Sequence, residues 1–167
     1  MVRLEKYSYR YAEQVLNSHL TLKNEVEAIL TAPDISLETL SRPEFNRVLE
    51  DKLVAAGWQR QPPVFDADDD ASARLDFMKD RVGIEVQFGH SSFIGIDLLK
   101  FQVASYSALD KLDVGIYVTT TRHFQKHMRE EHDQNWEGSL TFEKVQTYLP
   151  KFKSAIQVPL YVLGIDV

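Results

Sequence analysis

Three side chains with metal-binding chemistry stand close together in the run LDFMKDRVGIEVQFG, namely Asp76, Glu85 and Gln87. Magnesium favours one or two protein carboxylates and fills its remaining positions with water and substrate phosphate oxygens. Such an ion polarises a phosphoryl oxygen and lowers the pKa of the attacking water. The carbonyl of Val86 could be a further ligand, and the Gln87 amide could orient the nucleophilic water or donate to the phosphate. The residue types therefore predict metal-dependent phosphodiester hydrolysis, with a metal-bound hydroxide or a neighbouring phosphate as the base.

A β-hairpin would bring these residues together. Residues 75–79 and 82–88 have strand character, and a tight turn at residues 80–81 would join them antiparallel. In that register Asp76 faces Glu85, and facing residues have Cβ atoms roughly 4.5–5.5 Å apart. The period of two along a strand places Gln87 on the same face as Glu85. It points Ile84, Val86 and Phe88 into the core.

The alternative interpretation of this hairpin is a solvated sheet face that carries two ordinary exposed carboxylates. Facing carboxylates repel each other when no cation lies between them. This repulsion slightly favours the metal site over the solvated face.

Composition limits the class of protein. A chain of 167 residues is long enough for one domain with a single core. The sequence has no cysteine, which excludes disulfides and thiolate zinc sites and fits a reducing, cytoplasmic setting. Neither a transmembrane run nor an export signal is evident, so we expect a cytoplasmic protein with no membrane partner. The net charge of −6 argues against a surface coated in phosphate contacts but not against a locally basic cleft.

The remaining pattern predicts an α/β protein whose helices precede and follow the hairpin. The helix from Ile94 should cross between the second hairpin strand and the strand DVGIYVT as a parallel, right-handed unit. The expected elements are a broken helix over 9–30, a helix from the Ser41 cap to Gly57, a loop over 61–70, helices over 94–109, 123–131 and 142–152, and strands over 113–119 and 158–164.

The spacing D-x8-E-x-Q on a hairpin resembles the active site of BglII-type restriction endonucleases in the PD-(D/E)xK superfamily, with Gln in place of the usual Lys. The segments YSYRYAEQVLNSHL, EDKLVAAGW, VGIEVQF, DVGIYVTTT and VPLYVLG are similar to family segments in the same order. The resemblance implies a restriction-endonuclease-like three-layer fold with a mixed central sheet flanked by helices. It implies one domain over residues 1–167, with N-terminal helices in 1–32, a catalytic core in 43–120 and C-terminal helices and a last strand in 121–167.

The resemblance also implies the activity. Asp76, Glu85 and Gln87 would be catalytic, and Asp76, Glu85 and the Val86 carbonyl would bind Mg²⁺, for which Mn²⁺ could substitute. The substrate would be double-stranded DNA cut at a palindromic site, with a GATC core, in restriction-type defence beside a separate DNA methyltransferase. Cutting both strands needs two active sites, so we expect a homodimer that contacts through the N-terminal helices or the helix from Ile94.

Two segments are candidates for DNA contact. The loop after the catalytic strand offers His90, Ser91 and Ser92, and the helix after DVGIYVTTT offers Arg122, Lys126 and Arg129 on one face. Asn46 could support the hairpin from the preceding helix. The alternative is a polar turn and an ordinary solvated helix, and the loop GHSSFIG departs from the family's, so base contacts do not transfer.

Other hypotheses stay open at this stage. One is a DNA-binding or regulatory protein that keeps the fold without efficient cleavage, and another is a nuclease specific for branched or single-stranded DNA. The sequence ends at Val167, soon after its last predicted strand, where the enzyme that gives the family its name continues, so we expect a different or relaxed specificity. A zinc site on His123 and His127 is a weaker hypothesis, because the sequence has no HExxH motif.

Overall fold

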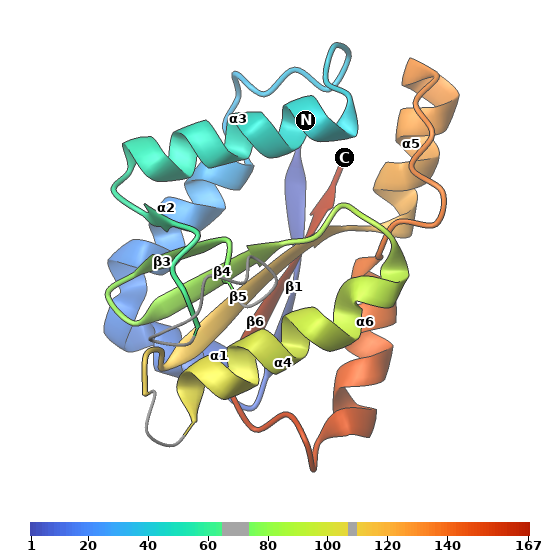
Figure 1. The fold of residues 1–167 in the computed structure, drawn as a ribbon. Helices are drawn as coiled ribbons and strands as arrows, with labels where there is room; N and C mark the ends of the chain where they lie inside the picture. Colours follow the sequence, from blue (N-terminus) through green and yellow to red (C-terminus); the bar gives the residue numbers. More distant parts are fainter. Residues whose placement is uncertain (65–73, 107–109) are drawn as a thin grey trace.

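A six-stranded mixed sheet runs through the middle of the protein (Figure 1). The structure is a computed structural model, and it describes residues 1–64, 74–106 and 110–167. The strand order is β1-β6-β5-β4-β3-β2. The strands are β1 (Arg3–Tyr9), β2 (Gln59–Arg60), β3 (Phe77–Lys79), β4 (Val82–Val86), β5 (Val114–Thr120) and β6 (Leu160–Asp166).

The centre of the sheet is parallel and its margins are antiparallel. β4 pairs with β5, and β5 with β6, in parallel. β1 runs antiparallel to β6, and β2, β3 and β4 form an antiparallel series on the other side. The predicted parallel unit from β4 through a helix to β5 is therefore confirmed. Parallel strands end at the same edge, so the carboxyl ends of β4, β5 and β6 lie together near both chain termini (Figure 1).

Helices cover both faces of the sheet, which gives three layers. One apolar cluster joins the sheet to α1 (Ala12–Leu16), α2 (Leu20–Leu30), α3 (Arg42–Ala55) and α5 (Arg122–His132). The other cluster joins the opposite face to α4 (Ile94–Ser105) and α6 (Phe142–Tyr148). Figure 1 shows α4 lying across the front of the sheet. No helix within the described residues is both long and apolar enough to cross a membrane.

Local sequence signals explain several boundaries. Ser41 caps α3 as predicted, and it forms a capping box with Glu44, in which the side chain of each residue accepts a hydrogen bond from the backbone amide of the other. The expected break in the first helical region is a 3₁₀ turn at Asn17–His19 between α1 and α2. The helix from Ile94 ends at Ser105, earlier than expected, and residues 107–109 lie outside the described residues. The same holds for residues 65–70 of the predicted loop.

Two strands were absent from the sequence prediction. β1 pairs with the last strand of the chain, and its side chains are mostly exposed or half-buried, so it carries little apolar alternation. β2 has only two residues. The pairing that stabilises each of them comes from distant parts of the chain, which a local pattern does not register.

Candidate active site

The β3–β4 hairpin has the predicted register. Asp80 and Arg81 both have positive φ, 44° and 66°, as the two central residues of a type I′ hairpin turn require. The turn pairs Lys79 with Val82, and the ladder continues to Phe77 opposite Ile84. Asp76 is the next residue before Phe77 and therefore stands opposite Glu85, at the end of the ladder.

The hairpin presents the Asp76 side chain to the end of β4. The Asp76 carbonyl accepts a hydrogen bond from Gln61 N at 2.8 Å, so the backbone polar groups of Asp76 point towards β2 rather than β4. Asp76 and Glu85 therefore form a non-hydrogen-bonded pair, the kind in which facing side chains lie closer together. Asp76 Oδ2 accepts a hydrogen bond from Val86 N at 2.8 Å. The amide and carbonyl of a strand residue point to the same side, so the Val86 carbonyl faces the Asp76 side as well.

This sheet face is covered, which excludes the solvated-face interpretation. Glu85 is only 2% exposed, although it carries a carboxyl group. Helix α4 lies over it and encloses a cavity of about 310 Å³. The cavity is lined by Gln61, Arg74, Leu75, Asp76, Glu85, Val86, Gln87, Phe93, Ile96, Asp97 and Lys100. All three predicted catalytic residues therefore line one cavity.

Three charged residues of the cavity were not predicted, namely Arg74 before β3 and Asp97 and Lys100 of α4. Lys100 Nζ lies 2.7 Å from Glu85 Oε1 and 3.4 Å from Asp97 Oδ1. Asp97 Oδ2 accepts hydrogen bonds from Gln87 Nε2 and from the Tyr117 hydroxyl, each at 2.8 Å. The available signal was a pair of opposite charges three residues apart within an otherwise apolar helix, where a charge is buried only when it is paired.

Burial and mutual repulsion perturb the acids of this site. Burial, reinforced by the charge of Asp76, raises the pKa of Glu85 to about 9, although Lys100 opposes the rise. Burial also raises the pKa of Asp76, against the hydrogen bond from Val86. Burial alone would lower the pKa of the Lys100 ammonium, but the surrounding carboxylates raise it. The cavity thus carries three acidic groups against the two cations Lys100 and Arg74.

A divalent cation fits this deficit. Three carboxylates, those of Asp76, Glu85 and Asp97, share the cavity with two cations, Lys100 and Arg74, and leave one net negative charge when all are ionised. Glu85 Oε1 is buried and receives no hydrogen bond from the described residues, its one close contact being the ion pair with Lys100. The described residues contain no cluster of three or more His, Asp or Glu side chains that converge as metal ligands. Two carboxylates and a carbonyl are instead the sparse set that Mg²⁺ accepts when substrate supplies other ligands.

The loop after β4 is held against the segment before α6. Leu140 N donates to Gly89 O at 2.9 Å and Ser91 N donates to Gly138 O at 3.0 Å. Ser92 N donates to His90 Nδ1, which leaves Nε2 of the exposed ring as its free nitrogen. The Ser91 hydroxyl accepts a hydrogen bond from Lys144 Nζ at 2.9 Å. His90, Ser91 and Ser92 therefore form an ordered polar turn directly beyond the catalytic strand.

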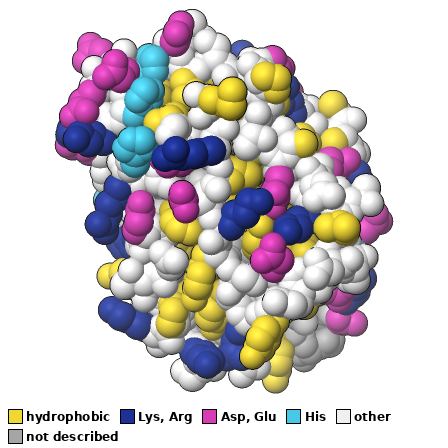
Figure 2. All heavy atoms as spheres, turned by 180° about the vertical axis from the view of Figure 1, so that it is seen from behind, with side chains coloured by type: hydrophobic (Ala, Val, Ile, Leu, Met, Phe, Trp, Pro, Cys, Tyr) yellow, Lys and Arg dark blue, Asp and Glu magenta, His cyan; other side chains and the backbone are white. Residues whose placement is uncertain are grey.

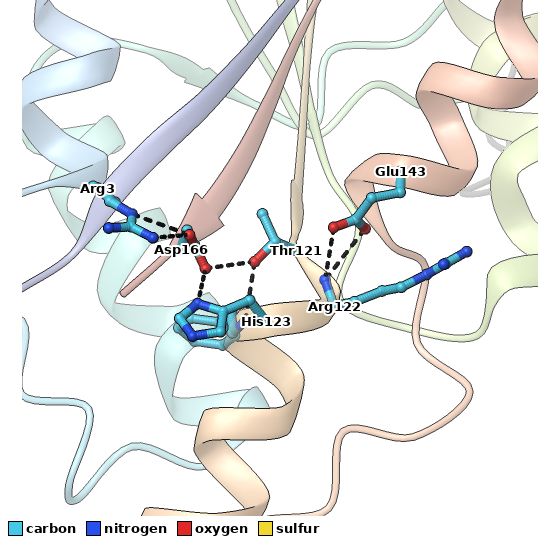
Figure 3. A network of polar contacts seen from close by, with 7 residues as sticks. Arg3, Thr121, Arg122, His123, Glu143 and Asp166 are labelled. Atoms are coloured by element: carbon cyan, nitrogen blue, oxygen red, sulfur yellow. Dashed lines mark hydrogen bonds and ion pairs between the residues drawn. The ribbon is translucent and has the colours of Figure 1, made fainter.

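The predicted basic face of α5 exists, but two of its three charges are paired. Arg122, Lys126 and Arg129 are all exposed on this helix. Lys126 lies 3.9 Å from Glu130, and Arg129 forms an ion pair with Glu137. Figure 3 shows the Arg122 side chain extending away from the protein while Glu143 binds its backbone amide. Arg122 has no ion pair among the described residues, so its guanidinium is the most available cation of this face.

A buried carboxylate fixes the start of α5. Asp166 accepts hydrogen bonds from Arg3 and from the Thr121 hydroxyl, and its Oδ1 lies 2.8 Å from His123 Nδ1 (Figure 3). Burial alone would raise the pKa of Asp166, but Thr121, Arg3 and His123 together lower it to about 2. The network ties the ends of β1, β5 and β6 together at the edge where β4 also ends.

Two further predictions concern Asn46 and a zinc site. Asn46 is exposed on α3 and does not line the cavity, so its supporting role stays a prediction.

Histidine side chains gather with acidic and basic ones at one corner of the face drawn in Figure 2, the end occupied by α5. His123 already contacts Asp166, and the described part of the chain holds no cluster of three metal-ligating side chains there, so zinc gains no support.

Comparison with known proteins agrees with this geometry. Residues 4–165 match the family described as Restriction endonuclease BglII/BglIII. The chain belongs to this family. None of the curated proteins compared with the chain matches it.

Solved structures of BglII share the fold. The crystal structure of restriction endonuclease BglII complexed with a DNA 16-mer has a TM-score of 0.76 and 20% sequence identity, and the match covers 99% of this chain and 77% of that one. The crystal structure of free BglII has a TM-score of 0.65 at 20% identity, and the match covers 97% and 78%. Membership of the BglII/BglIII family makes this chain a type II restriction deoxyribonuclease, a sequence-specific DNA endonuclease.

The raised pKa of Glu85 gives a prediction for the metal-free protein. The folded state holds the proton up to about pH 9, whereas an unfolded glutamate releases it near its ordinary value of 4.5. The folded state therefore binds more protons between these values, and its stability falls as the pH rises from about 5 to 9. We expect E85Q to remove most of this fall and to have a melting temperature a few degrees above the native one at pH 8.

Thermal unfolding in EDTA between pH 5 and 9 measures this effect. Lys52→Met, which removes a charge from a surface ion pair on α3, serves as the control and should keep the native pH profile. If E85Q shows the same dependence of melting temperature on pH as the native protein, Glu85 is ionised in the metal-free cavity.

Proposed function

We propose that this family member hydrolyses double-stranded DNA with Mg²⁺ held by Asp76, Glu85 and the Val86 carbonyl. The observation that carries the proposal is the opposition of two carboxylates with raised pKa in one cavity at the end of β4. When bound, Mg²⁺ polarises a phosphoryl oxygen and lowers the pKa of the attacking water, and Mn²⁺ can replace it. The complex of BglII with a DNA 16-mer supports DNA as the substrate.

The chain's own residues position this chemistry. Asp76 is oriented by its hydrogen bond from Val86 N to Oδ2, and its other oxygen can bind the ion. Gln87 donates one amide hydrogen to Asp97 and keeps the other, which can orient the nucleophilic water or bind the phosphate. The water oxygen bonds to phosphorus as one ester bond breaks, and a proton passes from the water to solvent or a neighbouring phosphate.

The polar turn after β4 and the basic face of α5 are the proposed DNA contacts. His90 can present Nε2–H to a base acceptor, and the hydroxyls of Ser91 and Ser92 can donate or accept at base edges. Arg122, with Lys126 and Arg129 on the same helix face, can bind backbone phosphates. Both segments lie at the edge of the sheet where β4 and β5 end.

An exposed apolar stripe on α4 favours a homodimer. Four apolar side chains on or beside this helix are each 46–60% exposed: Ile96 and Leu99 in α4, Phe93 just before it and Tyr106 just after it. Contiguous exposed apolar surface of this kind marks a protein interface. We assign it to a second copy of this chain, because a palindromic duplex needs two active sites related by a two-fold axis.

This assembly defines the expected biological setting. A dimer would cut both strands of a symmetric site, for which a GATC core is the proposed sequence. The enzyme would act in the cytoplasm in restriction-type defence, and a separate DNA methyltransferase would protect host sites. The lack of cysteine fits this compartment.

Plasmid cleavage tests the proposed function. We expect Mg²⁺ to give discrete fragments, EDTA to prevent them, and D76N or E85Q to reduce the rate by about a thousandfold or more, because each variant removes a metal ligand. Fragment mapping would give the site, and DNA affinity measured with Ca²⁺ should change far less than the rate. Retained DNA binding without cleavage by the native protein would favour the non-cleaving alternative, and preference for branched DNA would favour the structure-specific one.

Substitution on α4 tests the dimer. Leu99 is 51% exposed and does not line the cavity, so L99E places a charge on the stripe without touching the catalytic residues. We expect it to weaken dimerisation at least tenfold, about 1.4 kcal/mol, in sedimentation equilibrium. V54E provides the matched control on an exposed apolar residue of α3. Equal dimerisation of L99E and the native chain would exclude this face as the interface.

A further inference from the structure

The cavity contains a buried cation that the D-x8-E-x-Q pattern does not include. The Lys100 side chain is 14% exposed, and its ammonium reaches the cavity from α4 rather than from the catalytic hairpin. Its position is fixed by Glu85 Oε1 at 2.7 Å and by Asp97 Oδ1 at 3.4 Å. Because Asp97 and Lys100 are three residues apart, they project from the same side of the helix.

Gln87 cannot supply a positive charge at this place. Its amide is neutral, Nε2 donates to Asp97 at 2.8 Å, and Oε1 accepts from Gly89 N at 2.8 Å. Gln87 therefore ties the end of β4 to α4 and to its own loop. Arg74 also lines the cavity, but its guanidinium donates to the Gln61 carbonyl at 3.0 Å, so Lys100 is the cation that contacts Glu85.

We propose that Lys100 is a catalytic residue, whose ammonium binds a non-bridging oxygen of the scissile phosphate and stabilises the charge that develops there. This inference rests on the proposed function. Attack by water places additional negative charge on the phosphoryl oxygens, and an ammonium already held in place by Glu85 and Asp97 stabilises that charge. Lys100 keeps its protons throughout, while the water oxygen bonds to phosphorus and one ester bond breaks.

Asp97 is what holds this ammonium in place. It receives hydrogen bonds from Tyr117 and Gln87, so its carboxylate is fixed against the sheet. It gives Lys100 a second anchor besides Glu85. The ammonium can therefore stay in the cavity when Glu85 turns to another ligand.

Three variants test the role of Lys100. K100M removes the charge at similar length, K100Q removes it with a polar end, and K100R keeps a charge in a different shape. The single-turnover cleavage rate at saturating Mg²⁺ is compared with duplex affinity in Ca²⁺, with Mn²⁺ affinity of the DNA-free protein and with melting temperature. Lys52→Met is the control, since Lys52 pairs with Asp34 away from the cavity.

We expect K100M and K100Q to lower the rate by about a hundredfold or more, while duplex affinity and Mn²⁺ affinity stay within about threefold of native. K100R should recover part of the rate, and K52M should cleave as the native protein does. If K100M unfolds, K100Q decides the matter by the same comparison.

Two results would overturn the inference while leaving the proposed function intact. Native cleavage rates in K100M or K100Q would mean that Lys100 only neutralises Glu85. A loss of duplex affinity as large as the loss of rate would mean that it binds the ground state alone. Failure of the native protein to cleave any DNA would instead overturn the proposed function, and this inference with it.

Discussion

The mutual repulsion of two carboxylates, a buried one on Glu85 and a half-buried one on Asp76, is the constraint on which this site depends. Asp76 and Glu85 face each other at the close, non-hydrogen-bonded position of a hairpin, and burial raises the pKa of both. Such a pair is costly unless a proton or a cation separates the charges. Neighbouring strands hold both backbones in place despite this cost, because β2 lies beside Asp76 and β5 pairs with β4 at Glu85. Under the proposed function, a site built this way would bind a cation with little rearrangement.

Helix α4 covers Asp76 and Glu85 and forms one wall of their cavity. It crosses over the sheet between β4 and β5, and its apolar residues Leu98 and Phe101 pack into the core beneath it. The same helix carries Asp97 and Lys100 into the cavity, so the packing that stabilises the fold also sets the charges around Glu85. Its outer face carries the exposed apolar stripe. One helix thereby connects the core, the proposed chemistry and the proposed dimer.

The local parts of this account were predictable from the sequence. The turn at residues 80–81 and the period of two along a strand determine that Asp76 faces Glu85, and the structure has this register. Ser41 and Glu44 likewise mark the start of α3 in the sequence. Asp97 and Lys100 were missed because their place depends on how α4 lies over the sheet, which no local pattern specifies. β1 was missed for a related reason, since its partner β6 lies at the other end of the chain. The supporting role of Asn46 stays a prediction, and so do the DNA contacts of residues 90–92 and of α5, because these contacts form only in the bound complex.

The central claim is that Asp76 and Glu85 together hold one divalent cation. Titration of the native protein with Mn²⁺ at pH 8, followed by electron paramagnetic resonance, tests it most directly because it requires neither DNA nor cleavage. We predict that each chain binds one Mn²⁺ ion. The Mn²⁺ affinity should fall at least about tenfold in both D76N and E85Q and stay unchanged in K52M. Mn²⁺ binding that survives both substitutions at native affinity would contradict it.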